Sequence, residues 1–201
     1  MTGRAAAVIG AVLLALASVS PAAAFDPEKT YAQDTLVISP EGSYGWQFNL
    51  EDKHVFSDVE FWNVGVRFSL LPLGTSFRGT PFYGALETGL EPIYQHYTRP
   101  RDAFFAGLGT VLRYHFLSLG RVVPYAELAG FAGGTDLRIP EIRSDFTFMA
   151  FGGVGTSVFL TDHAALYGGY RFEHVSNGNT SQPNRGFENH VGVVGVSFYL
   201  P

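Results

Sequence analysis

The sequence predicts an all-β fold, namely an eight-stranded antiparallel transmembrane β-barrel of the outer-membrane type. Three observations indicate this fold: a secretory leader, recurring segments of alternating apolar and polar residues, and charges confined to one face of those segments. With 18 Phe, 10 Tyr, 2 Trp and 24 Gly, the composition favours strands and tight turns over helices. The chain has no cysteine, so the fold depends on backbone pairing and burial without disulfides.

Residues 1–24 are expected to be a signal peptide that does not belong to the fold. Arg4 provides a short basic start, Ala5–Leu16 is an apolar run, and Pro21–Ala24 offers a small-residue cleavage site before Phe25. Residues 25–201 contain no linker-like stretch and are expected to form a single β-barrel domain. They also lack the roughly 18 continuous apolar residues that a transmembrane helix requires.

An alternation with a period of two identifies the strands, because successive side chains of a strand point to opposite faces. An eighth strand is expected in the less regular stretch between Thr35 and Leu50. Turn-like residues separate the seven strands that the alternation places directly: Val59–Leu70, Phe82–Tyr94, Ala103–Phe116, Val123–Ala132, Phe146–Leu160, Ala164–Ser176 and Glu188–Leu200.

The two faces of the predicted strands differ in a way that indicates lipid on the outside. In Val59–Leu70 the even positions are mostly apolar, whereas Asn63 and Arg67 stand on the other face. A soluble barrel such as a lipocalin would show the reverse, with an apolar interior, and a soluble β-sandwich with one polar face is the alternative fold. Charges of both signs can pair in a narrow lumen that side chains fill, so no pore is expected. The charged residues assigned to the lumen are Arg67, Glu87, Glu91, Arg113, Glu127, Arg171 and Glu173.

The lengths of the connections predict which end of the barrel faces the periplasm. Both termini are expected there, so alternate strands run outward, starting with the first. The stretch Leu71–Pro81 is longer than a periplasmic turn normally is. Short periplasmic turns are predicted at Leu117–Val122 and Thr161–His163, and outer loops at Thr98–Asp102, Gly133–Asp145 and Asn177–Phe187.

Three polar residues interrupt the apolar outer face near the last outer loop. His174 and Ser176 share the parity of the lipid-facing residues of their strand, and Glu188 does so on the next strand. We expect Ser176 and Glu188 to lie roughly opposite each other, with His174 diagonal to Glu188 and within reach of it. This set supplies a nucleophile, a base and a carboxylate that orients the base.

Two asparagines of the same loop, Asn177 and Asn184, could donate hydrogen bonds to a developing oxyanion. The simpler interpretation is that Asn-Gly and Pro-Asn-Arg-Gly form ordinary turns, and that polar residues at the rim lie in the headgroup layer. The shared face, the shared end and the adjacent strands together favour a catalytic site.

The run His-x-Ser-Asn-Gly, followed by Gln-Pro-Asn-x-Gly and then Glu, resembles the signature of the outer-membrane lipid A 3-O-deacylases, the PagL family. The match covers roughly residues 171–190. The resemblance implies an eight-stranded barrel with a triad on its outer wall, in which Ser176 is the nucleophile, His174 the base and Glu188 its orienting partner. It also implies that Asn177 and Asn184 belong to the oxyanion region.

The function expected from these features is a serine esterase of the bacterial outer membrane. It would remove an ester-linked acyl chain from lipid A of lipopolysaccharide in the outer leaflet. Two alternatives stay open: a non-catalytic small barrel that acts as an adhesin or membrane organiser, and an outer-membrane phospholipase. The outer loops are short to moderate in length, which favours an enzyme over an adhesin.

Other classes of ligand are not indicated. All 18 acidic residues lie in residues 25–201 and no basic run occurs, so no nucleic-acid partner is expected. No metal is predicted, since no His/Asp/Glu cluster has ligand spacing, and no cofactor is predicted. Of the remaining histidines, His54, His96 and His163 are expected near solvated turns, His115 in the lumen, and His190 on the face of Glu188, where it could assist.

Overall fold

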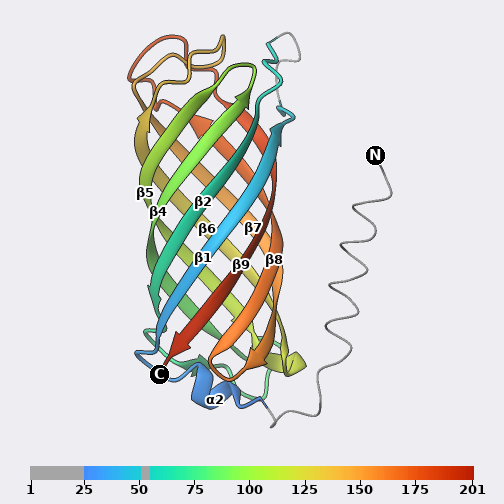
Figure 1. The fold of residues 1–201 in the computed structure, drawn as a ribbon. Coiled ribbons are helices and arrows are strands. Elements are labelled where there is room, and N and C mark those ends of the chain that lie inside the picture. The colour runs from blue at the N-terminus through green and yellow to red at the C-terminus, as the bar shows by residue number, and fades with distance from the viewer. Residues whose placement is uncertain (1–24, 51–54) are drawn as a thin grey trace, which may run out of the picture.

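The computed structural model describes residues 25–50 and 55–201, and within them eight long antiparallel strands close into a barrel (Figure 1). The predicted signal peptide and His54 lie outside the described residues. Each strand pairs with its neighbours along the chain, and the pairings β1–β9 and β2–β4 close the ring. The strands of the ring are β1 (Leu36–Gln47), β2 (Glu60–Leu70), β4 (Gly84–Arg99), β5 (Ala103–Phe116), β6 (Val122–Thr135), β7 (Phe146–Thr161), β8 (Ala164–Ser176) and β9 (Phe187–Leu200).

The short elements are found at the end of the barrel that carries both ends of the described chain, here called the terminal end. They are the helix α2 (Pro27–Thr30), the two-residue strand β3 (Thr75–Ser76), which pairs with β4, and the 3-10 turn η1 (Leu117–Leu119). In the part of the chain that is described, no helix has the length and apolar character needed to cross a membrane. The predicted fold class is confirmed, including the first strand between residues 35 and 50.

The predicted alternation of the faces is confirmed by burial. Val64, Leu128 and Val194 are 50%, 65% and 68% exposed on the outer face. The predicted lumen charges are all buried, and Glu41 of β1 joins them. Arg171 contacts Glu41 and lies 2.7 Å from Glu127. The interior therefore contains a network of opposite charges together with clusters of buried apolar residues, while the outer face is largely apolar.

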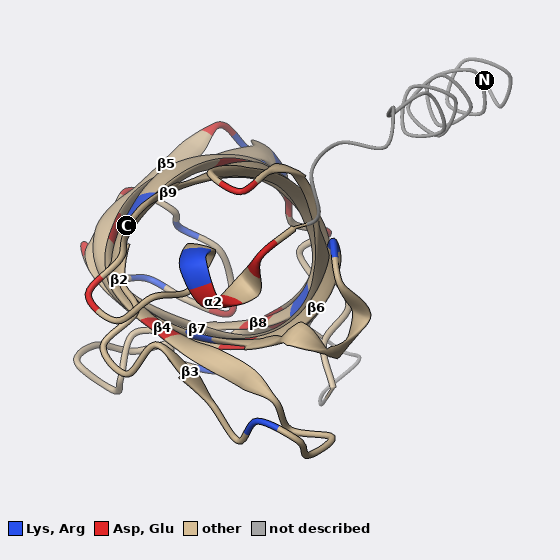
Figure 2. Ribbon diagram, turned by 90° about the horizontal axis from the view of Figure 1, so that it is seen from below, with Lys and Arg blue, Asp and Glu red and all other residues tan. Residues whose placement is uncertain are grey.

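The N-terminal segment closes the terminal end of the barrel. Asp26 caps α2 by accepting a hydrogen bond from the Glu28 amide (3.0 Å), and the helix lies within the ring of strands when seen from below (Figure 2). The hydroxyl of Tyr31, which is buried, is 3.2 Å from Nδ1 of His115 and 3.3 Å from the hydroxyl of Tyr199. The lumen position expected for His115 is thus correct: Nε2 of its ring is 2.7 Å from Glu87 of β4, and its second partner, Tyr31, comes from the segment before β1.

The long connection between β2 and β4 holds this N-terminal segment in place. Glu28 accepts a hydrogen bond from Thr75 (2.8 Å), lies 2.5 Å from the Arg78 guanidinium, and also contacts the Tyr83 hydroxyl. The hydrogen bond from Arg78, and then that from Tyr83, lowers the pKa of Glu28 from 4.5 to about 2. The length of residues 71–83, unusual for a turn, is explained by this docking role.

Candidate active site

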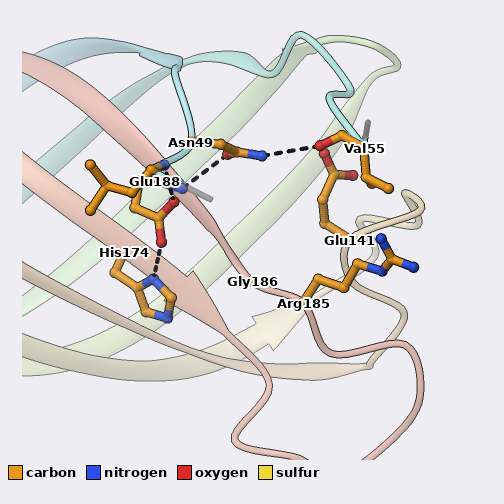
Figure 3. Close-up of a pocket in the computed structure, with 8 residues that line it drawn as sticks. Asn49, Val55, Glu141, His174, Arg185, Gly186 and Glu188 are labelled. Atoms are coloured by element: carbon orange, nitrogen blue, oxygen red, sulfur yellow. Dashed lines mark hydrogen bonds and ion pairs between the residues drawn. The ribbon is translucent and has the colours of Figure 1, made fainter. Parts of the chain in front are cut away.

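A histidine–carboxylate pair lies on the outer wall, at the end of the barrel opposite the termini. His174 of β8 and Glu188 of β9 are direct cross-strand neighbours, and Nδ1 of His174 is 2.9 Å from Oε1 of Glu188 (Figure 3). The His174 side chain is 43% exposed and that of Glu188 17%. Arg171 and Glu173 of the same strand are buried in the lumen, so the outward orientation predicted for His174 is confirmed.

The register between β8 and β9 differs from the expected one. His174, and not Ser176, stands opposite Glu188, because the ladder runs without a shift from Ala164↔Phe198 to Val175↔Phe187. Ser176 is the last residue of β8, is half-buried, and pairs with Phe148 of β7. Two residues of a strand lie about 6.6 Å apart on the same face. Ser176 therefore follows His174 on the outer face, one step nearer the loop.

Gly186 stands at the next register position, where Ser176 would find its partner on the continuation of β9. Its φ is +68°, and a Cβ atom there would lie 2.8 Å from Cε1 and 3.3 Å from Nε2 of His174. The imidazole edge that carries Nε2 is thus packed over Gly186, on the Ser176 side of the ring. When Nδ1 donates to Glu188, Nε2 is the acceptor and can receive the proton of a nucleophile.

The β8–β9 loop is organised by its own asparagines. Asn177 is buried, and its Nδ2 donates to the carbonyl (2.9 Å) and hydroxyl (3.0 Å) of Ser181 and to the carbonyl of Pro183 (3.3 Å). Asn184 accepts from the Asn177 amide (2.9 Å) and donates one Nδ2 hydrogen to Asn179 (3.2 Å), and an amide carries a second hydrogen. The expected oxyanion role of both asparagines stays a prediction, and for Asn177 it would require the side chain to leave these partners.

The β1–β2 connection also reaches the site. The amide of Leu50 donates to Oε2 of Glu188 (3.0 Å), and Oδ1 of Asn49 accepts from the Glu188 amide (3.3 Å) (Figure 3). Sequence reasoning missed both residues, since neither belongs to a motif and Asn49 lies 139 residues from Glu188 in the chain. They line a cavity of about 540 Å³ together with Val55, Glu141, His174, Arg185, Gly186 and Glu188.

On its other side, His174 borders a hollow of about 470 Å³ in the outer wall. Its floor follows one register row, in which Ala150 of β7 pairs with His174 and Gly130 of β6 pairs with Ala150. Both residues face outward and are small, whereas Leu128 and Phe172 form a bulkier row beside them. We call this hollow the wall groove; it is lined by Thr110, Leu112, Leu128, Ala129, Gly130, Ala150, Phe151, Gly152, Phe172 and His174.

The remaining histidines have partners of their own. Nδ1 of His190 is 2.6 Å from the Tyr170 hydroxyl, and its ring stacks on Phe48 at 3.9 Å between centroids. His190 stands opposite Phe172 and is the next outward-facing residue of β9 after Glu188, farther from the loop. The proposed assistance to the site stays a prediction. His163 is exposed in the β7–β8 turn, as expected, whereas His96 is half-buried on β4.

Comparisons with known proteins identify the family and the fold. The family model described as lipid A 3-O-deacylase (PagL) matches residues 41–197. The crystal structure of the outer membrane enzyme PagL superimposes with a TM-score of 0.57 at 16% identity, over 77% of this chain and 97% of that one. Neisserial surface protein A (NspA) gives 0.58 at 13% identity, over 81% and 96%. No curated protein matched the sequence. At these identities the two structures establish the likeness of the fold.

Proposed function

Because this chain belongs to the lipid A 3-O-deacylase (PagL) family of the bacterial outer membrane, we propose that it is a serine esterase. It removes an ester-linked acyl chain from lipid A in the outer leaflet, with Ser176 as nucleophile. The observation that carries this proposal is the 2.9 Å contact between His174 and Glu188 on the lipid-facing wall. Polar side chains on a lipid-facing surface are costly and point to a functional role.

The geometry fits acyl transfer in two steps. In the first, Nε2 of His174 takes the proton from the Ser176 hydroxyl while Oγ attacks the ester carbonyl, and Glu188 stabilises the imidazolium that forms. The tetrahedral intermediate collapses, the sugar alkoxide leaves with the proton from Nε2, and the acyl chain is bound to Ser176. In the second step His174 deprotonates a water molecule, which attacks the acyl-serine ester; the bond from the acyl carbon to Oγ then breaks, and Nε2 returns its proton to Oγ. The products are a free fatty acid and regenerated Ser176.

The oxyanion that forms in both steps needs hydrogen-bond donors. Asn184 is the better placed of the two candidates, because its amide carries a hydrogen beyond the one that it donates to Asn179. Asn177 holds the loop that presents Asn184, through its bonds to Ser181 and Pro183. In this proposal Asn177 either keeps the loop in the shape that presents Asn184 to the oxyanion, or leaves Ser181 and Pro183 and donates to the oxyanion itself.

The wall groove supports an acyl chain as the group that is cleaved. It begins at His174 and continues over Ala150 and Gly130, so a chain attached to the reacting carbonyl can lie along it. Lipid tails are as apolar as the groove, so moving a chain between them yields little hydrophobic free energy. The groove therefore selects an acyl chain by its shape and aligns the ester with Ser176.

The proposal is tested with Ser176→Ala, His174→Ala and Glu188→Ala in the full-length barrel. Lipid A from cells with and without each variant is examined by mass spectrometry, and turnover of purified lipid A is measured in detergent. We expect the serine and histidine variants to lose at least ~10³-fold in turnover, and the glutamate variant to lose less. Heat-modifiable electrophoresis checks that each barrel is folded. If Ser176→Ala retained wild-type turnover the assignment would be wrong, and release of fatty acid from phospholipid vesicles alone would identify a phospholipase.

A further inference from the structure

The loop between β1 and β2 lies outside the catalytic strand pair β8–β9, and it holds the carboxylate of Glu188. Resting on the proposed function, we infer that Asn49 is a positioning residue of the active site, and that residues 47–50 form a clamp that fixes the orientation of Glu188. The clamp acts on the base through Glu188, and none of its residues is expected to contact the reacting atoms. Figure 3 shows Asn49 bridging Glu188 and Val55.

The two oxygens of Glu188 have different partners. Oε1 is 2.9 Å from Nδ1 of His174, and Oε2 accepts the Leu50 amide hydrogen at 3.0 Å. The Glu188 backbone is held as well, since its carbonyl accepts from the Phe48 amide at 3.0 Å. A carboxylate bound only through Oε1 could rotate about its side-chain torsions. With Oε2 bonded to a backbone amide, its plane is fixed and Oε1 stays directed at the imidazole.

Asn49 is the residue that gives the clamp its shape. Its Oδ1 accepts from the Glu188 amide (3.3 Å) and from Nε2 of Gln47 (3.0 Å), and its Nδ2 donates to the Val55 carbonyl (3.1 Å). Its φ is +44°, a left-handed conformation that asparagine tolerates better than most residues. One side chain therefore joins β9, the end of β1 and the connection that leads to β2, at the point where the chain turns toward Glu188.

The clamp is anchored to a buried carboxylate of the β6–β7 loop. Glu141 is buried, and its Oε1 accepts from Nε2 of Gln47 (2.8 Å) and from the Ser57 amide (3.0 Å). Its Oε2 accepts from the Ser57 hydroxyl (2.6 Å), and its backbone carbonyl accepts from the Arg185 amide (2.9 Å). Hydrogen bonds thus run from Glu141 through Gln47 and Asn49 to Glu188, so that three loops fix one catalytic carboxylate.

Two substitutions separate the positioning role from simple loss of structure. Asn49→Gly keeps the left-handed conformation and removes the side chain, whereas Asn49→Asp keeps both the conformation and an acceptor for the Glu188 amide. We expect Asn49→Gly to lower kcat by ~10–100-fold with KM changed less than about 2-fold, because small misplacements of a catalytic group are expensive. Asn49→Asp loses the donor to the Val55 carbonyl but keeps the acceptor for the Glu188 amide, so its kcat should fall between those of the wild type and Asn49→Gly. Asp34→Gly, at a position with φ +63° near the terminal end, is the matched control, since it also removes a side chain and keeps a left-handed backbone.

The decisive measurement is a double-mutant cycle with Glu188→Ala, made on the folded barrel with lipid A in detergent. If Asn49 acts through Glu188, Asn49→Gly should have no further effect once the carboxylate is gone. An equal loss in both backgrounds, or wild-type kcat for Asn49→Gly, would overturn the inference. Ser176→Ala is run alongside: activity in that variant refutes the serine mechanism, whereas an inactive Ser176→Ala with an active Asn49→Gly refutes only the clamp.

Discussion

Substituting Gly186 by alanine is expected to disable the site without unfolding the barrel. The added Cβ would lie 2.8 Å from Cε1 of His174, whereas carbon atoms pack at ~3.5 Å or more, so the imidazole must move by about 0.7 Å. The Val175 carbonyl oxygen would lie only 3.1 Å from the same Cβ, which restricts the room for Cβ to shift. A misplacement of ~1 Å costs on the order of 10²-fold in rate. That factor corresponds to about 2.7 kcal/mol of transition-state stabilisation.

The backbone contribution can be measured separately. Gly186 has φ +68°, and a left-handed conformation costs a residue other than glycine about 1–2 kcal/mol in stability. Gly120 has φ +64° in the β5–β6 turn, and a Cβ atom there would meet nothing within 4 Å. Gly120→Ala is therefore the control for strain at a glycine of positive φ away from the site: with ψ of −126° its loss of stability should be at least as large, and its activity should be that of the wild type.

The assay is lipid A turnover in detergent, with kcat and KM determined for both alanine variants at matched folded fractions. Folded fractions come from heat-modifiable electrophoresis, and stability from urea titration. The kcat of Gly186→Ala should be ~30–100-fold lower than that of Gly120→Ala. Equal kcat values in the two variants would show that the imidazole does not depend on the space above Gly186, and the packing argument would be refuted.

Three further predictions concern the wall groove, the lumen and the terminal end. Gly130→Leu should fill the wall groove and slow deacylation by at least ~10-fold, whereas Gly192→Leu, on the outer face of β9 with equally open space, should not. Arg171→Met leaves two buried carboxylates without this partner and should destabilise the barrel by ~3–5 kcal/mol in urea titration, while exposed Arg143→Met should change stability by less than ~0.5 kcal/mol. Because the pKa of Glu28 is lowered to about 2, the stability that it contributes is present above pH ~4.5 and lost as the pH falls toward 2; in Glu28→Gln this part of the acid dependence of the thermal midpoint should vanish.

The strands and their orientation were predictable because their signal is local and repeated. A period of two can be read from any few residues, and a one-residue slip would expose Arg67 or Arg171 to lipid. Because such a slip has a large energetic cost, the residues of each strand can be assigned to the outer or the inner face from the sequence. Glu41 was missed because the first strand has a less regular pattern, with Pro40 and Gly42 on either side of it.

The candidate site was predictable in its residue types and face, and its register was not. The parity of His174 and Ser176 follows from Arg171 and the apolar residues of the same strand. Which of them faces Glu188 depends on how many loop residues close the hairpin, and here pairing continues to Val175↔Phe187 before the loop begins. The sequence does not indicate at which residue pair the ladder ends, since hydrogen bonds inside the loop determine where pairing stops.

Contacts between loops were decided by the tertiary structure alone. The clamp joins Asn49 to Glu188 across 139 residues, and Tyr31 meets Tyr199 across 168. Such contacts have no period, because each depends on the closure of the barrel that brings the first and last strands together as β1 and β9. The sequence by itself determined a lipid-facing barrel and a Ser-His-Glu set on its outer face. The closed barrel decided which segments lie against that set, since only closure brings the loop after β1 beside β9.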